Sequence, residues 1–234
     1  MRDKWFFPAA GGFAALIVIV SLLPGLGNLP SGPVTGNGKN YDRITVAGDY
    51  LNKIVAGGDA ITELVRGEDG QRLLYIEAEA GALRLEADAG PHFKLASDME
   101  LQYAGQRIRC TVRVRPADDR GALQVALEYS VGREGDSGWQ LLDLQPGFSD
   151  VSFIYDVPEL RGEQGFDYFG IRPVVPQKAR AILVERVTFE RLGPVPEKEE
   201  EPEPTTPEQV GGERLPEGGE AITTENDAPD PETL

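Results

Sequence analysis

The chain has 234 residues, enough for one sizeable domain with appendages, and its 28 Gly and 18 Pro suit a turn-rich β protein better than a helical bundle. A formal net charge of −16, from 39 acidic and 23 basic residues, argues against a nucleic-acid partner. One Cys and one His exclude an internal disulfide framework and a His-rich metal site.

The first segment of the chain is apolar. No charged residue lies between Lys4 and Lys39, and residues 5–23 read WFFPAAGGFAALIVIVSLL. A helix that rises about 1.5 Å per residue would make this stretch roughly 28 Å long, close to the hydrocarbon thickness of a bilayer. We therefore expect a transmembrane helix over 5–23 that acts as a signal-anchor. A cleaved signal peptide is the alternative, because the small residues 25–27 resemble a cleavage site.

The flanking charges predict the orientation of this span. Arg2 and Lys4 precede it, and basic residues favour the cytoplasmic side of a membrane. Residues 1–4 are therefore expected in the cytoplasm, and the rest of the chain in the periplasm or outside the cell. The protein would then be a single-pass protein of the inner (plasma) membrane. Residues 24–40 form a Gly/Pro linker that spaces the next domain off the bilayer.

The last segment, 197–234, carries 13 acidic residues against two basic ones, six Pro and no aromatic residue. Such a composition buries too little apolar surface to order the chain, so we expect a disordered acidic Pro/Glu-rich tail. It is interpreted as a solubilising brush, or as an interaction arm for a basic partner.

The middle segment, 41–196, predicts an all-β sandwich. From about 60 onwards, short apolar alternations are broken by turn residues every 8–15 positions. The stretch 106–115 is the clearest, with Ile108, Cys110, Val112 and Val114 on one face. The region 41–65 stays open between a strand and a helical turn. The expected strands are 73–79, 83–88, 106–115, 123–129, 139–144, 151–157, 166–174 and 181–192.

Residues 147–158, GFSDVSFIYDVP, resemble a stretch that recurs in jelly-roll carbohydrate-binding modules of the galactose-binding-domain-like type. Residues 169–172 and 182–189 are similar to the last two strands of that family. The resemblance implies a jelly-roll β-sandwich that binds sugar without catalysis. In that family the last strand often helps to hold a structural calcium ion. Here Glu185 and Arg186 replace the family's paired Asp, so we expect no cofactor and no metal site, with a structural calcium ion as the open alternative.

Four cations share the polar face of the 106–115 strand, where they repel one another unless they are neutralised. One interpretation is cross-strand carboxylates, for which Glu86, Asp88, Glu128 and Asp156 are the candidates. The other is an anionic ligand such as an acidic polysaccharide, bound by arginine forks. The four candidate ligand-binding residues are Arg107, Arg109, Arg113 and Arg115.

Two aromatic residues are the best candidates for stacking on a sugar ring, Trp139 after a Gly-rich turn and Tyr168 on the polar side of its strand. Tyr103 and Phe148 are further candidates. His92 is expected in a turn, and no nucleophile motif accompanies it, so no catalytic residue is predicted.

These features favour a membrane-anchored, extracytoplasmic binding module that recognises glycan at the cell envelope and is not an enzyme. The alternative is a structural or accessory subunit whose sandwich docks a protein partner in a membrane assembly. A glycosidase that uses Glu77 and Glu79 is a third hypothesis, but the domain offers little room for a substrate cleft.

Overall fold

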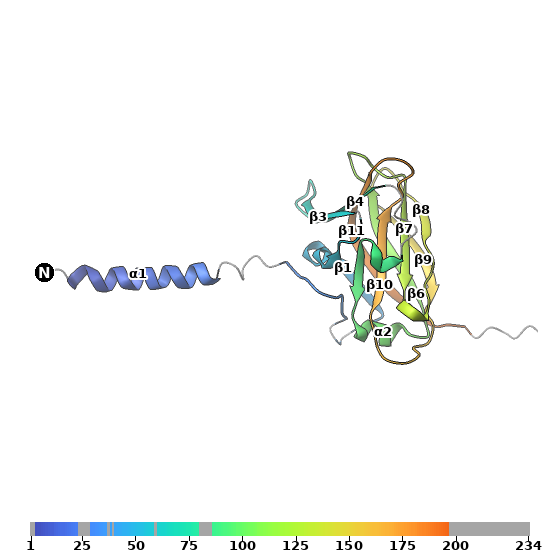
Figure 1. The fold of residues 1–234 in the computed structure, drawn as a ribbon, viewed down its shortest axis with the longest axis horizontal. Helices are drawn as coiled ribbons and strands as arrows, with labels where there is room; N and C mark the ends of the chain where they lie inside the picture. Colours follow the sequence, from blue (N-terminus) through green and yellow to red (C-terminus); the bar gives the residue numbers. More distant parts are fainter. Residues whose placement is uncertain are drawn as a thin grey trace, which may run out of the picture. The chain divides into compact units, whose positions relative to one another are not determined.

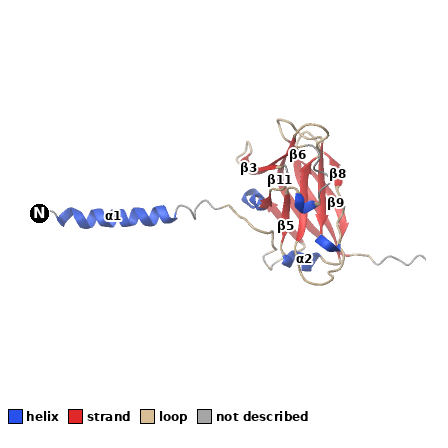
Figure 2. Ribbon diagram, viewed as in Figure 1, coloured by secondary structure: helices blue, strands red, loops and turns tan. Residues whose placement is uncertain are grey.

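The computed structural model describes residues 3–22, 29–36, 38, 40–58, 60–79 and 86–196. The predicted acidic tail, 197–234, lies outside the described residues. From residue 41 to 196 the described chain forms a sandwich of two antiparallel sheets, as expected for an all-β domain (Figures 1 and 2).

One sheet has six strands and the other has five. The six-stranded sheet contains β3 (Ile61–Arg66), β4 (Arg72–Ala78), β11 (Arg180–Pro194), β6 (Gln106–Pro116) and β9 (Ser149–Asp156), in that order, with β1 (Arg43–Ala47) also paired to β11. The five-stranded sheet contains β2 (Ile54–Val55), β5 (His92–Leu95), β10 (Asp167–Pro173), β7 (Gln124–Ser130) and β8 (Gln140–Asp143).

From β4 to β11 the chain passes to the opposite sheet at every step except between β7 and β8. The resulting neighbours, β4-β11-β6-β9 facing β5-β10-β7-β8, have the strand order of a jelly roll. Short helical segments connect the strands: η2 (Gly48–Lys53), η4 (Ala87–Ala89), α2 (Ser97–Tyr103) and η5 (Gly132–Glu134).

The period-two pattern of the strands builds the core, because alternate side chains of each sheet point to the other sheet. On β6 the four expected apolar residues are fully buried, and burial raises the pKa of the Cys110 thiol well above its usual value. Across the sandwich, Phe169 of β10 meets Phe189 of β11 edge to face, with ring centroids 5.1 Å apart.

The structure differs from the sequence prediction between β4 and β6. The predicted strand 83–88 is wrong at its end, because Ala87–Ala89 form the turn of helix η4; residues 83–85 lie outside the described part. His92 was expected in a turn but lies on β5, whose Phe93 and Leu95 are buried in the core. Leu123 was expected to point inward. It precedes β7 instead and is 82% exposed.

The N-terminal segment forms helix α1 (Asp3–Leu22), close to the helix expected over 5–23. Within the described residues, no helix combines the length and apolar character needed to cross a membrane. The structure therefore confirms a helix here, and its role as a membrane anchor stays a prediction.

Candidate functional site

The four arginines of β6 lie on the outward face of the six-stranded sheet, and each contacts a carboxylate. Arg107 donates two hydrogen bonds, of 2.6 and 2.8 Å, to the carboxylate of Asp156 on β9. The other three pairs are Arg109 with Glu190 at 3.0 Å, Arg113 with Glu185 at 3.0 Å, and Arg115 with Asp118 at 2.7 Å.

Three of these contacts match the first interpretation of the arginine face, that cross-strand carboxylates neutralise it. The fourth is local, because Asp118 follows Arg115 by three residues in the turn after β6. The hydrogen bond from Arg107 holds the pKa of Asp156 below its usual value. Asp156 was a predicted partner, whereas Glu128 was wrongly placed: it lies on β7, in the other sheet. Binding of an anionic ligand to this face stays a prediction.

Trp139 and Tyr168 lie on the other side of the sandwich, on the outward face of the five-stranded sheet. Gly170 of β10 has no side chain there, and a Cβ at this position would lie 2.8 Å from the Trp139 ring. The indole therefore rests on the backbone of β10. The Arg172 guanidinium lies 5.0 Å from the centre of the same ring.

Tyr168 is the next outward residue along β10, about two strand residues from Gly170. Its ring meets His92 of β5 edge to face at 5.5 Å. Beyond it, Phe166 is 41% exposed and has the Lys94 ammonium 3.6 Å from its ring centre. Phe166 and Tyr168 thus share the outward side of β10 with Gly170, on which Trp139 rests. We call these three rings the aromatic row.

Two charged residues beside this row, Arg172 and Glu128, are buried. Helix η4 covers them: a Cβ on Gly90 would meet the Arg172 guanidinium, and the Ala87 N–H bonds the Glu128 carboxylate. Burial, with a contribution from Asp136, raises the pKa of Glu128 to about 7. On the outward face of this sheet, Arg172 and Glu128 are therefore buried under η4 and not exposed to solvent. We call these two buried charged residues the polar floor.

An open groove of about 580 Å³ continues from the aromatic row at the end of the sandwich. Phe166 and Tyr168 form one side, and the η5 turn, the loop between β9 and β10, and Glu100 of α2 form the rest. This volume falls in the range of small-molecule binding sites. The charged residues that line the groove are Glu100, Arg133, Glu134, Arg161 and Glu163.

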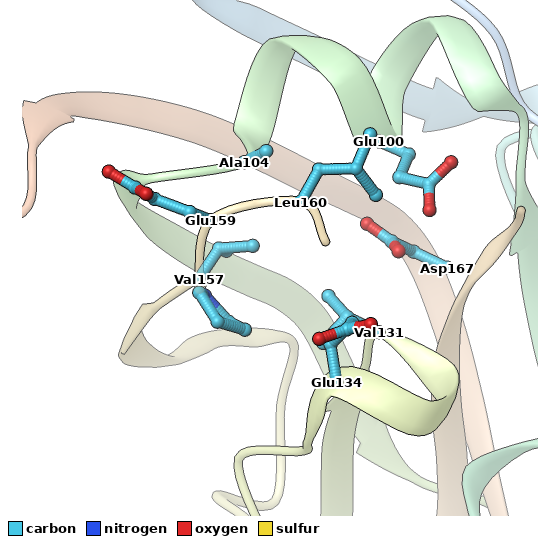
Figure 3. A pocket seen from close by; sticks show the side chains of 9 residues that line it. Glu100, Ala104, Val131, Glu134, Val157, Glu159, Leu160 and Asp167 are labelled. Atoms are coloured by element: carbon cyan, nitrogen blue, oxygen red, sulfur yellow. The ribbon is translucent and has the colours of Figure 1, made fainter. Parts of the chain in front are cut away.

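A smaller pocket opens beside the groove and shares Glu100, Val131, Glu134 and Leu160 with it (Figure 3). Its remaining lining includes Asp167, whose carboxylate points into it. None of its nine lining residues is basic. Nevertheless, no group of three or more His, Cys, Asp or Glu among the described residues is arranged to hold a metal ion.

Sequence reasoning found two members of the aromatic row and missed the third, Phe166. Two of its further candidates are placed elsewhere. Tyr103 is fully buried in the core, and Phe148 packs under Arg115 with the guanidinium 5.3 Å from its ring. Glu77 is engaged by Arg120 at 2.6 Å on the six-stranded sheet. The alternation of β10 marks Tyr168, Gly170 and Arg172 as outward, and this was the available signal for the polar floor.

No known family profile and no curated protein matches this sequence. Solved structures of similar fold include the CBM22-1 xylan-binding domain of Paenibacillus barcinonensis Xyn10C, at 12% identity and a TM-score of 0.43, which covers 61% of this chain and 87% of that one. The CBM22-2 domain of the same protein has 11% identity and a TM-score of 0.46, and covers 63% and 98%.

A third similar structure is the C-terminal family 22 carbohydrate-binding module of Clostridium thermocellum Xyn10B. It has 14% identity and a TM-score of 0.38, and covers 63% of this chain and 90% of that one. All three TM-scores lie below 0.5.

Proposed function

We propose that this chain is a non-catalytic glycan-binding protein whose ligand lies along β10, on the outward face of the five-stranded sheet and in the adjoining groove. The observation that carries the proposal is the row of Phe166, Tyr168 and Trp139 beside a groove of about 580 Å³. Aromatic faces offer apolar area to the C–H side of a sugar ring, and flanking charged groups bond its hydroxyls.

The polar groups near the rings suit a hydroxyl-rich ligand. Lys94 lies at the Phe166 ring, and Arg133 and Arg161 line the groove beside acidic residues. Cationic donors and anionic acceptors are therefore both available, and a sugar hydroxyl can form hydrogen bonds with either. Binding needs only this face and no nucleophile, which agrees with the absence of a catalytic motif in the sequence.

The test is a glycan array followed by calorimetry on the full chain in detergent. We expect saturable binding that Tyr168→Ala and Trp139→Ala each weaken at least tenfold, or about 1.4 kcal/mol. Phe148→Ala is the matched control, because it removes a ring from the opposite sheet and should leave affinity unchanged. Absence of saturable binding to every glycan on the array would refute the proposal.

We further propose that residues 5–23 tether the domain to the inner (plasma) membrane, with residues 1–4 in the cytoplasm. Support comes from the uncharged sequence between Lys4 and Lys39, and from the exposed apolar side chains of α1 such as Phe13, Leu16 and Val18. The full chain should stay in the membrane pellet after alkaline extraction. Its release into the supernatant would contradict the tether.

A protein-docking accessory role is the second candidate. The observation that favours it is a hollow of about 350 Å³ at the opposite end of the sandwich, which Leu123, Val174 and Pro176 line together with three polar or charged residues. Leu123 is one of the most exposed apolar residues of the described chain. Co-purification of a stoichiometric membrane protein that Leu123→Ser abolishes, without any glycan binding, would favour this role.

A further inference from the structure

The small pocket of Figure 3 lies where α2, the η5 turn and the loop after β9 converge. Glu100 comes from α2, Glu134 from η5, and Asp167 is the first residue of β10. In Figure 3 the Asp167 carboxylate points into the pocket, whereas Glu159 points away from it. The pocket is thus a concave acidic site built from three separate elements.

Asp167 is the notable member of this group. Its side chain is fully buried, and one carboxylate oxygen, Oδ2, accepts a hydrogen bond of 2.6 Å from the Tyr129 hydroxyl. The other oxygen, Oδ1, is buried and has no hydrogen-bond partner among the described residues. A buried carboxylate oxygen without a donor is costly, so Oδ1 is an open acceptor that a water molecule or a donor group of a ligand can fill.

The size of the pocket limits what that donor can be. The pocket holds about 10 Å³, which is the space of one water-sized group. A protonated primary amine has this size and presents three N–H donors with a positive charge. A larger cationic group such as a guanidinium does not fit into this volume.

A cation would also lower the electrostatic cost of ionising Asp167 in this pocket. Burial, followed by the neighbouring charge of Glu100, raises the pKa of Asp167 to about 7, opposed by the hydrogen bond from Tyr129. Glu100 is already held by the Gly165 N–H at 2.7 Å and therefore stays in place. An ammonium group beside Asp167 would offset the repulsion between the two carboxylates.

The pocket and the groove share four lining residues. Because Asp167 points inward from β10 and Tyr168 points outward, an oligosaccharide can have the amine of one sugar in the pocket and a neighbouring sugar ring on the aromatic row. We propose, building on the proposed function, that this chain binds glycans that carry free primary amines, such as de-N-acetylated amino sugars. The amine occupies the pocket formed by Asp167, Glu100 and Glu134, and the sugar body lies against Phe166 and Tyr168.

The test compares two oligosaccharides of equal length that differ only in the amine. Calorimetry at pH 7 on the full chain in detergent uses a glucosamine hexamer and an N-acetylglucosamine hexamer. We expect the glucosamine hexamer to bind at least tenfold more tightly. Asp167→Asn removes the carboxylate that would ionise beside an ammonium group, and it should reduce this preference at least fivefold. Glu134→Gln, at an exposed position that the fold tolerates, should reduce it in the same direction.

Glu63→Gln serves as the matched control, because Glu63 is an exposed acid on β3 and should leave the preference unchanged. Equal or tighter binding of the N-acetylated hexamer would overturn the amine inference and leave glycan binding intact. A preference that survives both pocket substitutions would also overturn it. Binding of a polylysine peptide with no binding to either hexamer or to other glycans would overturn both this inference and the proposed function.

Discussion

Two carboxylates decide the electrostatics of the five-stranded sheet. Asp167 is buried at the start of β10 and Glu128 is buried under η4, and burial raises the pKa of each to about 7. In both cases the charged form is disfavoured because water is excluded. Both residues therefore hold protons in the folded chain at pH values where the unfolded chain has lost them.

This proton binding has a definite sign. Between the ordinary carboxyl pKa and about 7, the folded state binds more protons than the unfolded state, so the free energy of unfolding falls as pH rises. We expect Asp167→Asn to be more favourable relative to the parent chain at pH 8 than at pH 5. Urea denaturation at both pH values measures this difference, and parallel shifts at the two values would contradict it.

At the scale of the element, η4 is the segment that distinguishes the two sheet faces. The outward face of the six-stranded sheet is exposed to solvent and carries several ion pairs. The corresponding face of the five-stranded sheet carries η4, which buries Arg172 and Glu128 beside Trp139. Gly90 makes this close approach possible, because it places no side chain against the guanidinium.

We expect Gly90→Ala to destabilise the fold by about 1–3 kcal/mol, because the new Cβ would lie 1.6 Å from a nitrogen of the fully buried Arg172 guanidinium, which would have to move. The Trp139 fluorescence should shift with it. Gly147→Ala is the matched control, since a Cβ there meets nothing within 4 Å. Equal stability of the two variants would contradict the requirement for glycine beside the Arg172 guanidinium.

At the scale of the whole molecule, the jelly roll separates two charged faces by the width of its core. The paired arginines of β6 are on one face, and the aromatic row along β10 is on the other. Half-exposed ion pairs such as Arg109–Glu190 contribute little to stability. The two faces should therefore act independently.

We expect the double variant Arg109→Gln/Arg113→Gln to change glycan affinity by at most about twofold, ~0.4 kcal/mol. The same calorimetry on the full chain checks this. A loss of tenfold or more would place the ligand on the six-stranded sheet, as the anionic-ligand hypothesis for the β6 arginines predicts.

Local patterns were sufficient to predict much of the fold. Period-two alternation located β6, β7, β9, β10 and β11, because inward side chains must be apolar wherever a strand covers a core. The same alternation marked Tyr168 as outward. It failed for His92 and for η4, because a four-residue strand and a single helical turn carry too few residues to show a period.

Only the tertiary structure brought the site together. Trp139 lies above Gly170, η4 buries Arg172, and α2 places Glu100 beside Asp167. The members of these pairs are 31 to 85 positions apart in the sequence. Strand register likewise decided which carboxylates neutralise Arg107, Arg109 and Arg113. Alternation specifies the side of a strand on which a residue lies. Its neighbours across the sheet depend on strand pairing, which no local pattern encodes.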